Sequence, residues 1–266
     1  IARVSAKIAV GLRLDEIQIA NTPASFEPAL DYVVTKIARF PFDKFATAQN
    51  TLGTQMKATG EVMSVGRTLE ESLLKAVRSL ETGVCHIYHK KFDNWDTARL
   101  LEYIRTATDD RLYAIAQLIR LGVDLGMVYN ATKIDMFFLE KFKHVVEFEE
   151  VIRNNPNNPE TVRDAKLLGI SDKYIAQEWG CTEHDIYSMR DANNIFHVYK
   201  MIDTCASEFS SYVPYFYSTY EAENESIVSD RKKIIVLGSG PIRIGQGVEF
   251  DYSTVHAIWS IRRAGY

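Results

Sequence analysis

The sequence has few cysteines, no long apolar run and no large excess of either charge. Only Cys85, Cys181 and Cys205 occur among 266 residues, and they are far apart. This spacing argues against a disulfide-stapled secreted domain and is typical of reduced cytosolic thiols. No apolar run reaches the roughly 18 residues of a membrane-spanning helix, and the N-terminus lacks the layout of a signal peptide. We therefore expect a cytoplasmic protein without a membrane partner.

The charge balance is slightly acidic, with 31 Lys and Arg residues against 35 Asp and Glu residues. A weak net negative charge does not attract nucleic acid or an anionic membrane surface. The hydrophobic fraction of 46% and the charged fraction of 25% are those of ordinary globular proteins. We therefore expect one or two folded domains with no nucleic-acid partner.

The first part of the chain predicts α/β structure. Four apolar residues lie about one helical turn apart and predict a helix with one buried stripe: Ile1, Val4, Ile8 and Leu12. The β-branched and aromatic segments 32–40 and 61–66 predict two strands. Thr68 then has the character of a helix N-cap, because acidic residues follow it in the first turn. This segment predicts a strand, a turn and a helix.

Residues 69–195 predict a succession of short capped helices and contain no convincing strand. The expected N-caps are Asp93 or Asn94, Asp109, Asp124, Asp135, Ser171 and Thr182. The helix after Asp135 is expected to be the longest, with an apolar face that includes Phe138, Leu139, Phe142, Val145, Val146, Phe148, Val151 and Ile152. Pro159 is expected at the first position of a further helix. The sequence therefore predicts a mainly α central domain.

Strand patterns return after His197, in segments 197–203 and 215–220. The apolar run 233–237 is typical of a buried parallel strand. A glycine-rich loop over 238–247 and a helix over 251–263 complete the first half of a βαβ unit. The chain begins within a helix, without methionine, and ends just after another. We therefore expect a middle piece of a longer protein.

The glycine-rich loop follows a strand and precedes a helix, as phosphate-binding loops do. The dinucleotide fingerprint Gly-x-Gly-x-x-Gly requires a third glycine, and Arg243 occupies that position. A tight turn with close backbone packing is therefore favoured over a dinucleotide site.

Two other local patterns favour structural interpretations. One pattern is the group Cys85, His86 and His89, and the other is the run 183–185. Each lacks a second pair of ligands at zinc spacing, so we expect both to consist of surface or loop residues. Segment 175–186 resembles a helix-turn-helix, but its second helix carries Arg190 among several acidic residues. Such a helix would be repelled by phosphates, which argues against DNA binding.

Glu61 and Glu249 each follow closely after a glycine in a strand-and-loop unit. Carboxylates in such places are often simply exposed, but they could equally line a polar passage between domains. The sequence pattern leaves both interpretations open.

Five stretches together resemble the large subunit of carbamoyl phosphate synthetase, in family order across nearly the whole chain. They are TPASFEPALDYVVTKIARFPFDKF, TQMKATGEVMSVGRTLEESLLKA, KIDMFFLEKF, HVYKMIDTCASEFSSYVPYFYSTYE and VLGSGPIRIGQGVEFDYSTVHA. The resemblance implies a helical oligomerisation domain at 82–195. It also implies partial α/β flanks: the end of the first ATP-grasp half at 1–81, and connecting strands with the pre-ATP-grasp start of the second half at 196–266.

The resemblance implies a ligase that makes carbamoyl phosphate from bicarbonate, glutamine-derived ammonia and two ATP, with Mg as metal and a glutaminase small subunit as partner. Arginine and pyrimidine synthesis are both open as pathways. The family's catalytic, ATP-binding and metal-binding residues have no counterparts in this stretch, so we expect the isolated chain to be inactive. The alternative is a free-standing, non-catalytic helical adaptor.

The resemblance also implies that four residues line the family's carbamate tunnel. Met56 and Glu61 match its first-half wall, and Gly247 and Glu249 match its second-half wall. A glycine would keep the bore open, and a carboxylate would give it a polar lining. Self-association is expected through the helical domain.

Overall fold

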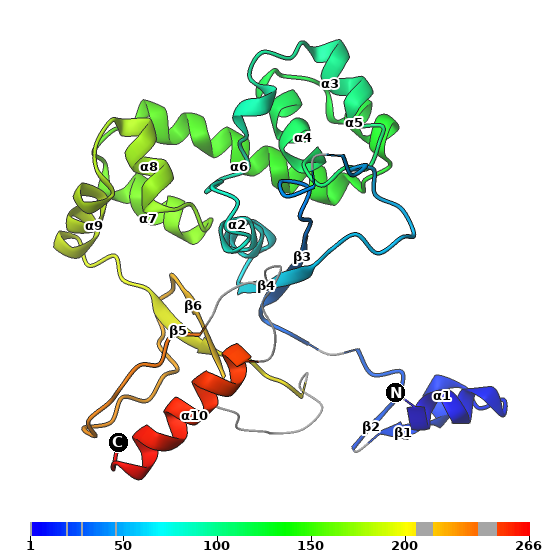
Figure 1. Cartoon of the computed structure of the whole chain (residues 1–266), viewed down its shortest axis with the longest axis vertical. Coiled ribbons are helices and arrows are strands. Elements are labelled where there is room, and N and C mark those ends of the chain that lie inside the picture. The colour runs from blue at the N-terminus through cyan, green and yellow to red at the C-terminus, as the bar shows by residue number, and fades with distance from the viewer. Residues whose placement is uncertain (1, 20, 28, 46, 206–214, 239–248) are drawn as a thin grey trace.

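The computed structural model describes residues 2–19, 21–27, 29–45, 47–205, 215–238 and 249–266. Its main body is helical, with smaller strand and helix units attached below it in the view of Figure 1. The body contains α2 (Leu69–Ser79), α3 (Thr97–Tyr103), α4 (Arg111–Arg120), α5 (Leu125–Thr132), α6 (Met136–Asn154), α7 (Pro159–Leu167), α8 (Asp172–Trp179) and α9 (Glu183–Ala192). The predicted central helical domain is confirmed.

Most of the helices begin where the sequence predicts. Backbone N–H groups donate to the side chains of Thr68, Asp124, Asp135, Ser171 and Thr182. Pro159 is the first residue of α7, as predicted. Two cap predictions are wrong by one to three residues. Asp96 caps α3 instead of Asp93 or Asn94, and α4 follows Asp110 instead of Asp109.

The longest helix, α6, crosses the whole helical body (Figure 1) and packs against α2, α4, α5, α7 and α8. Its inward face carries Leu139, Val145, Val146 and Ile152, which are all buried. The predicted apolar face is wrong at two positions, because Phe138 is 43% exposed and Val151 is 41% exposed. Both side chains lie outside the packed stripe, so the buried face of α6 is narrower than its apolar pattern predicts.

Two antiparallel strand pairs lie beside the helical body. Strands β3 (Val33–Arg39) and β4 (Gly60–Gly66) confirm the first two predicted strands, and α2 packs against them. Strands β5 (Val198–Met201) and β6 (Phe216–Thr219) confirm the two predicted after His197. A third, short pair is formed by β1 (Gln18–Ile19) and β2 (Thr22–Pro23).

The first helix, α1 (Ala2–Ala9), forms as predicted, but its expected buried stripe is wrong. No described residue of α1 is buried, and Ile8 is 46% exposed. An amphipathic pattern identifies an apolar face but cannot supply the surface that covers it.

The predicted buried strand at 233–237 is also wrong. This segment is irregular, and Ile235 and Leu237 are 85% and 84% exposed. A parallel strand needs a hydrogen-bonded neighbour, and no described strand pairs with this one. The predicted helix follows as α10 (Glu249–Arg263), whereas most of the glycine-rich loop, including Arg243, lies outside the described residues.

Candidate functional site

Glu61 lies at the exposed edge of the β3–β4 pair. Its Oε1 atom is 2.8 Å from Lys36 Nζ, and both side chains are more than half exposed. Glu61 also borders a recess of about 490 Å³ whose other walls come from β4 and α2. A hydrated carboxylate with a nearby ammonium can hydrogen-bond a small polar guest.

Of the four predicted tunnel residues, Met56 and Glu61 are the two whose side chains the structure describes. Met56 lies in the loop before β4, is 92% exposed and does not border the recess beside Glu61. Gly247 lies outside the described residues, and Glu249 is the first residue of α10, whose side chain there is not described. Their role in a tunnel stays a prediction.

A second polar cluster lies inside the helical body, around Glu149 on α6. Its Oε1 atom is 3.0 Å from His86 Nε2 and accepts a hydrogen bond of 2.7 Å from Arg120 Nη2. Its Oε2 atom accepts hydrogen bonds from Arg120 Nε at 2.9 Å and from Arg153 Nη2 at 3.0 Å. Glu149 is 1% exposed, so this carboxylate is a buried charge held by two guanidinium groups.

The surroundings fix the charge state of this cluster. Burial alone would raise the pKa of Glu149, but the hydrogen bonds from Arg120 and His86 outweigh it and lower the pKa to about 2. Burial lowers the pKa of His86, whose ring stacks on Tyr174 at 3.9 Å. A neutral His86 therefore donates its Nε2–H to Glu149.

The sequence predicts surface or loop residues for the histidines near Cys85, and His86 is a loop residue that is not on the surface. His86 lies in a loop, but it is 2% exposed and belongs to the Glu149 cluster. One sequence signal was available: Glu149 lies on the same helical face as Val145, Val146 and Ile152. In the described part of the chain, no three His, Cys, Asp or Glu side chains are arranged to hold a metal ion.

A third cluster, around Glu71 in the first turn of α2, joins three separate parts of the chain. Its Oε2 atom accepts hydrogen bonds from Arg67 N at 2.7 Å and from Thr219 Oγ1 at 3.0 Å. Its Oε1 atom is 2.6 Å from Lys75 Nζ, which also donates to the carbonyl oxygen of Ser218. Strand β6 is therefore attached to the start of α2, and Glu71 is 1% exposed at that joint.

The helical body reaches the same joint through Gly169, in the turn between α7 and α8. Its carbonyl oxygen accepts a hydrogen bond of 2.6 Å from Arg78 Nη1. A Cβ atom at Gly169 would lie 2.7 Å from the Cα atom of Glu71. Sheet β3–β4 with α2, strand β6 and the α7–α8 turn thus meet at one residue, Glu71: its carboxylate binds Thr219 of β6, and its backbone lies against Gly169.

We expect Gly169→Ala to destabilise the chain more than Gly180→Ala does. Both glycines have positive φ angles, +81° and +68°, but a Cβ at Gly180 meets no atom within 4 Å. The Gly180 variant therefore reports only the left-handed strain, about 1 kcal/mol. The backbone clash with Glu71 should cost Gly169→Ala about 2 kcal/mol more. Urea unfolding measures both, and equal losses would contradict the close contact.

In the helix-turn-helix segment, the basic side chain of Arg190 is bound by other residues of the same chain. Arg190 of α9 forms an ion pair with Asp172 at 2.7 Å and donates to the Tyr220 hydroxyl at 3.0 Å. Its side chain is only 12% exposed. This guanidinium therefore binds α8 and the end of β6, not an external phosphate.

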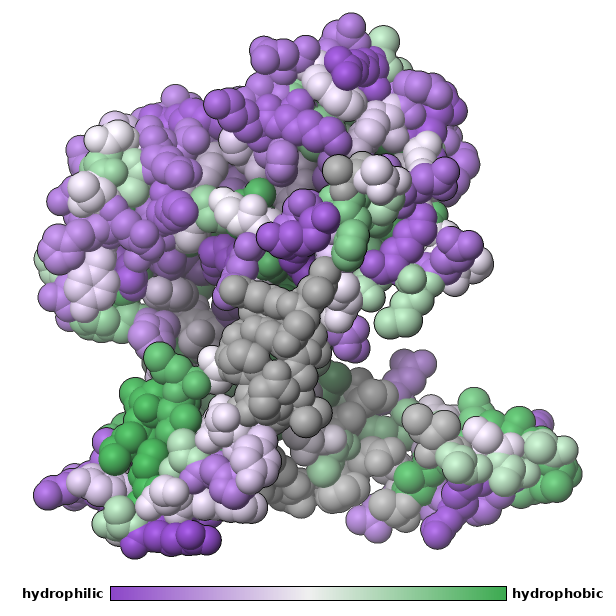
Figure 2. All heavy atoms as spheres, in the orientation of Figure 1, coloured by the Kyte–Doolittle hydropathy of each residue, from purple (hydrophilic) through white to green (hydrophobic). Residues whose placement is uncertain are grey.

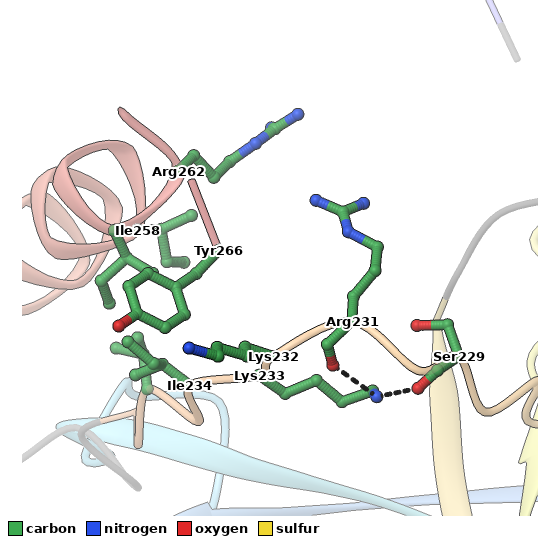
Figure 3. A pocket seen from close by; sticks show the side chains of 10 residues that line it. Ser229, Arg231, Lys232, Lys233, Ile234, Ile258, Arg262 and Tyr266 are labelled. Atoms are coloured by element: carbon green, nitrogen blue, oxygen red, sulfur yellow. Dashed lines mark hydrogen bonds between the residues drawn. The ribbon is translucent and has the colours of Figure 1, made fainter. Parts of the chain in front are cut away.

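The last described segment forms a cavity of about 350 Å³ between residues 229–236 and α10. Figure 3 shows Ile234, Ile258 and Tyr266 gathered on one side of it, with Arg231 and Arg262 extending away. Lys233 Nζ donates to the carbonyl oxygens of Ser229 and Arg231. Ile234 and Val236 of this segment thus line the cavity beside α10, whereas Ile235 and Leu237 are largely exposed.

Comparison with protein families gives two matches. Residues 61–194 match the model described as the oligomerisation domain of the carbamoyl-phosphate synthetase large chain. Residues 230–266 match the model described as the preATP-grasp domain of carbamoyl phosphate synthase. The first match covers half of the chain, from β4 to just beyond α9, and both matches confirm the resemblance of the sequence motifs. None of the described helices is long and apolar enough to cross a membrane.

Proposed function

The chain belongs to the family of carbamoyl-phosphate synthetase large chains, and from this premise we propose that it serves as their joint and self-association module. The observation that carries the proposal is the match over 61–194, which coincides with one continuous apolar core running from α2 to α9. The Glu71 joint supports it further, because it links this core to both flanking strand pairs.

We further propose that a complete large chain of this kind is a ligase that makes carbamoyl phosphate from bicarbonate, ammonia and two ATP. ATP and Mg would bind outside this chain, and a glutaminase small subunit would supply the ammonia. Met56, Glu61, Gly247 and Glu249 would line its carbamate tunnel, which the recess beside Glu61 supports. We propose that the chain is divided into three domains, at 1–81, 82–195 and 196–266. The first and the last belong to the two ATP-grasp halves.

We expect the isolated chain to self-associate and to show no bicarbonate-dependent hydrolysis of ATP. Light scattering coupled to size-exclusion chromatography measures the first property, and phosphate release with and without bicarbonate measures the second. A monomer at every concentration would contradict the self-association role. Phosphate release that depends on bicarbonate would contradict the absence of catalysis.

The second candidate is a free-standing, non-catalytic adaptor, which the Glu149 and Glu71 clusters, bonded to side chains of this same chain, would also suit. An immunoblot of the source cell separates the two candidates. A band several-fold above 30.3 kDa supports the large chain, whereas a band at that mass supports the adaptor.

A further inference from the structure

A recess of about 410 Å³ lies where the β3–β4 sheet and α2 meet the start of α4. Its walls come from the end of β3, the end of α2, segment 89–91 and the first turn of α4. The apolar part of these walls consists of Ile37, Ala38, Phe40 and Leu80. Small-molecule sites typically combine such apolar walls with a few polar groups that point inward.

Tyr113 of α4 presents an unused hydroxyl to this recess. The residue is 8% exposed, and burial raises its pKa to about 12, so the hydroxyl keeps its proton at neutral pH. The hydroxyl forms no hydrogen bond with another described residue. It is also not sealed in the interior, so it opens to the recess. Because buried hydroxyls are normally hydrogen-bonded, this donor is suited to an acceptor from outside the chain.

His89 adds a second donor beside Tyr113. The centres of the two rings are 5.6 Å apart, and both residues line the recess. His89 Nδ1 accepts a hydrogen bond of 3.1 Å from the backbone N–H of Lys91. The hydrogen of the neutral ring is therefore on Nε2, and no described residue accepts it.

The charges of the recess leave a carboxylate without a cation. Arg39 forms an ion pair with Asp43 at 3.1 Å. Lys91 forms one with Asp110 at 2.5 Å, so both basic side chains are already paired. Asp109, at the exposed rim, forms no ion pair with a described residue. Burial and the charge of Asp110 raise its pKa, and a cation beside it would offset both effects.

We propose that this recess binds a small primary amine that also carries a hydroxyl or carbonyl oxygen. The ammonium group pairs with Asp109, the oxygen accepts hydrogen bonds from Tyr113 and His89, and a short hydrocarbon body lies against the apolar walls. A neutral oxygen suits the site better than a carboxylate, because the unpaired charge there is already negative. The site is independent of the self-association and of the tunnel proposed above.

The probe is 4-aminobutanol, and butylamine and butanol are its matched controls. Titrations of the full chain, followed by methyl NMR, give the dissociation constants and show whether Ile37 and Leu80 respond. We expect each control compound to bind at least about tenfold more weakly than 4-aminobutanol, because it lacks the oxygen or the ammonium group. Equal affinities for all three compounds would overturn the ligand class, and no saturable binding of 4-aminobutanol would overturn the site.

Two conservative variants test the polar contacts. Tyr113→Phe should weaken binding of 4-aminobutanol about fivefold, and Asp109→Asn at least about tenfold. Tyr187→Phe and Asp191→Asn make the same changes at exposed positions on α9 and should bind the probe like the unchanged chain. Unchanged affinity in both recess variants would overturn the site. Tyr113→Phe should also keep the unfolding midpoint in urea, and a lower midpoint would show that the hydroxyl serves the fold instead.

Discussion

The Glu149→Gln variant is expected to lose about 3 kcal/mol of unfolding free energy at neutral pH relative to the unchanged chain. The substitution keeps the size of the side chain but removes the buried charge that faces Arg120 and Arg153. The pKa of Glu149 is lowered from 4.5 to about 2, and each pKa unit corresponds to about 1.4 kcal/mol. Urea unfolding followed by circular dichroism measures the difference.

The pH dependence of the same variant gives an independent check. Because the pKa of Glu149 is lowered by folding, its contribution is fully present above pH 4.5 and is lost as the pH falls towards 2. The unchanged chain should therefore lose stability more steeply over that interval than Glu149→Gln does. Glu140→Gln, an exposed position on the same helix, is the control. Equal unfolding midpoints for all three proteins at pH 7 would contradict the assigned role of Glu149.

Helix starts could be predicted from the sequence because capping is a local interaction. Thr182 and Asp185 illustrate this, since each side chain accepts a hydrogen bond from the other residue's backbone N–H. The two wrong caps failed for a less local reason. Asp93 accepts a hydrogen bond from Tyr88 and does not cap α3. Helix α4 follows Asp110, whose carboxylate accepts bonds from Lys91 and Tyr103 and makes no side-chain cap, so this helix start lacks the local signal that capping supplies. Competition among several partners cannot be read from one segment.

Burial was predicted less well than secondary structure because it depends on distant partners. The apolar run 233–237 has the composition of a core strand, yet it has no paired neighbour and is largely exposed. Figure 2 shows hydrophobic residues gathered on the lower part of the molecule, while the helical body above is mostly hydrophilic on this face. Hydrophobic periodicity therefore predicts which face of a helix or strand is apolar, but not whether another element covers that face.

The candidate sites differ in the same way, because some can be found from local sequence and others depend on distant partners. Glu61 could be singled out from its place after Gly60 and from the family resemblance. The Glu149 and Glu71 clusters could not, because their partners are far away in the sequence: His86 lies 63 residues from Glu149, and Thr219 lies 148 residues from Glu71. A buried carboxylate within an apolar face indicates that a cationic or hydrogen-bonding partner exists, but not which residue supplies it.

Glu71→Ala is expected to loosen strands β5 and β6 without unfolding the helical body. The substitution removes the acceptor for Thr219 Oγ1 and for the backbone N–H of Arg67, and it removes the charge opposite Lys75. Losing these contacts should cost about 2 kcal/mol locally, which corresponds to a ~30-fold fall in amide protection. Because the α6 core contains neither strand, most of its amides should keep their protection.

Hydrogen exchange followed by mass spectrometry distinguishes this local opening from a general loss of stability. Glu70→Ala is the matched control, because Glu70 is equally buried in the same turn but contacts Lys141 and His144 of α6. That variant should weaken the contact between α2 and α6 and leave β5–β6 protected. Thr219→Val, which removes only the hydroxyl, should give a smaller version of the Glu71 effect. If Glu70→Ala and Glu71→Ala change the same amides, Glu71 is not the specific link between the helical body and the β5–β6 pair.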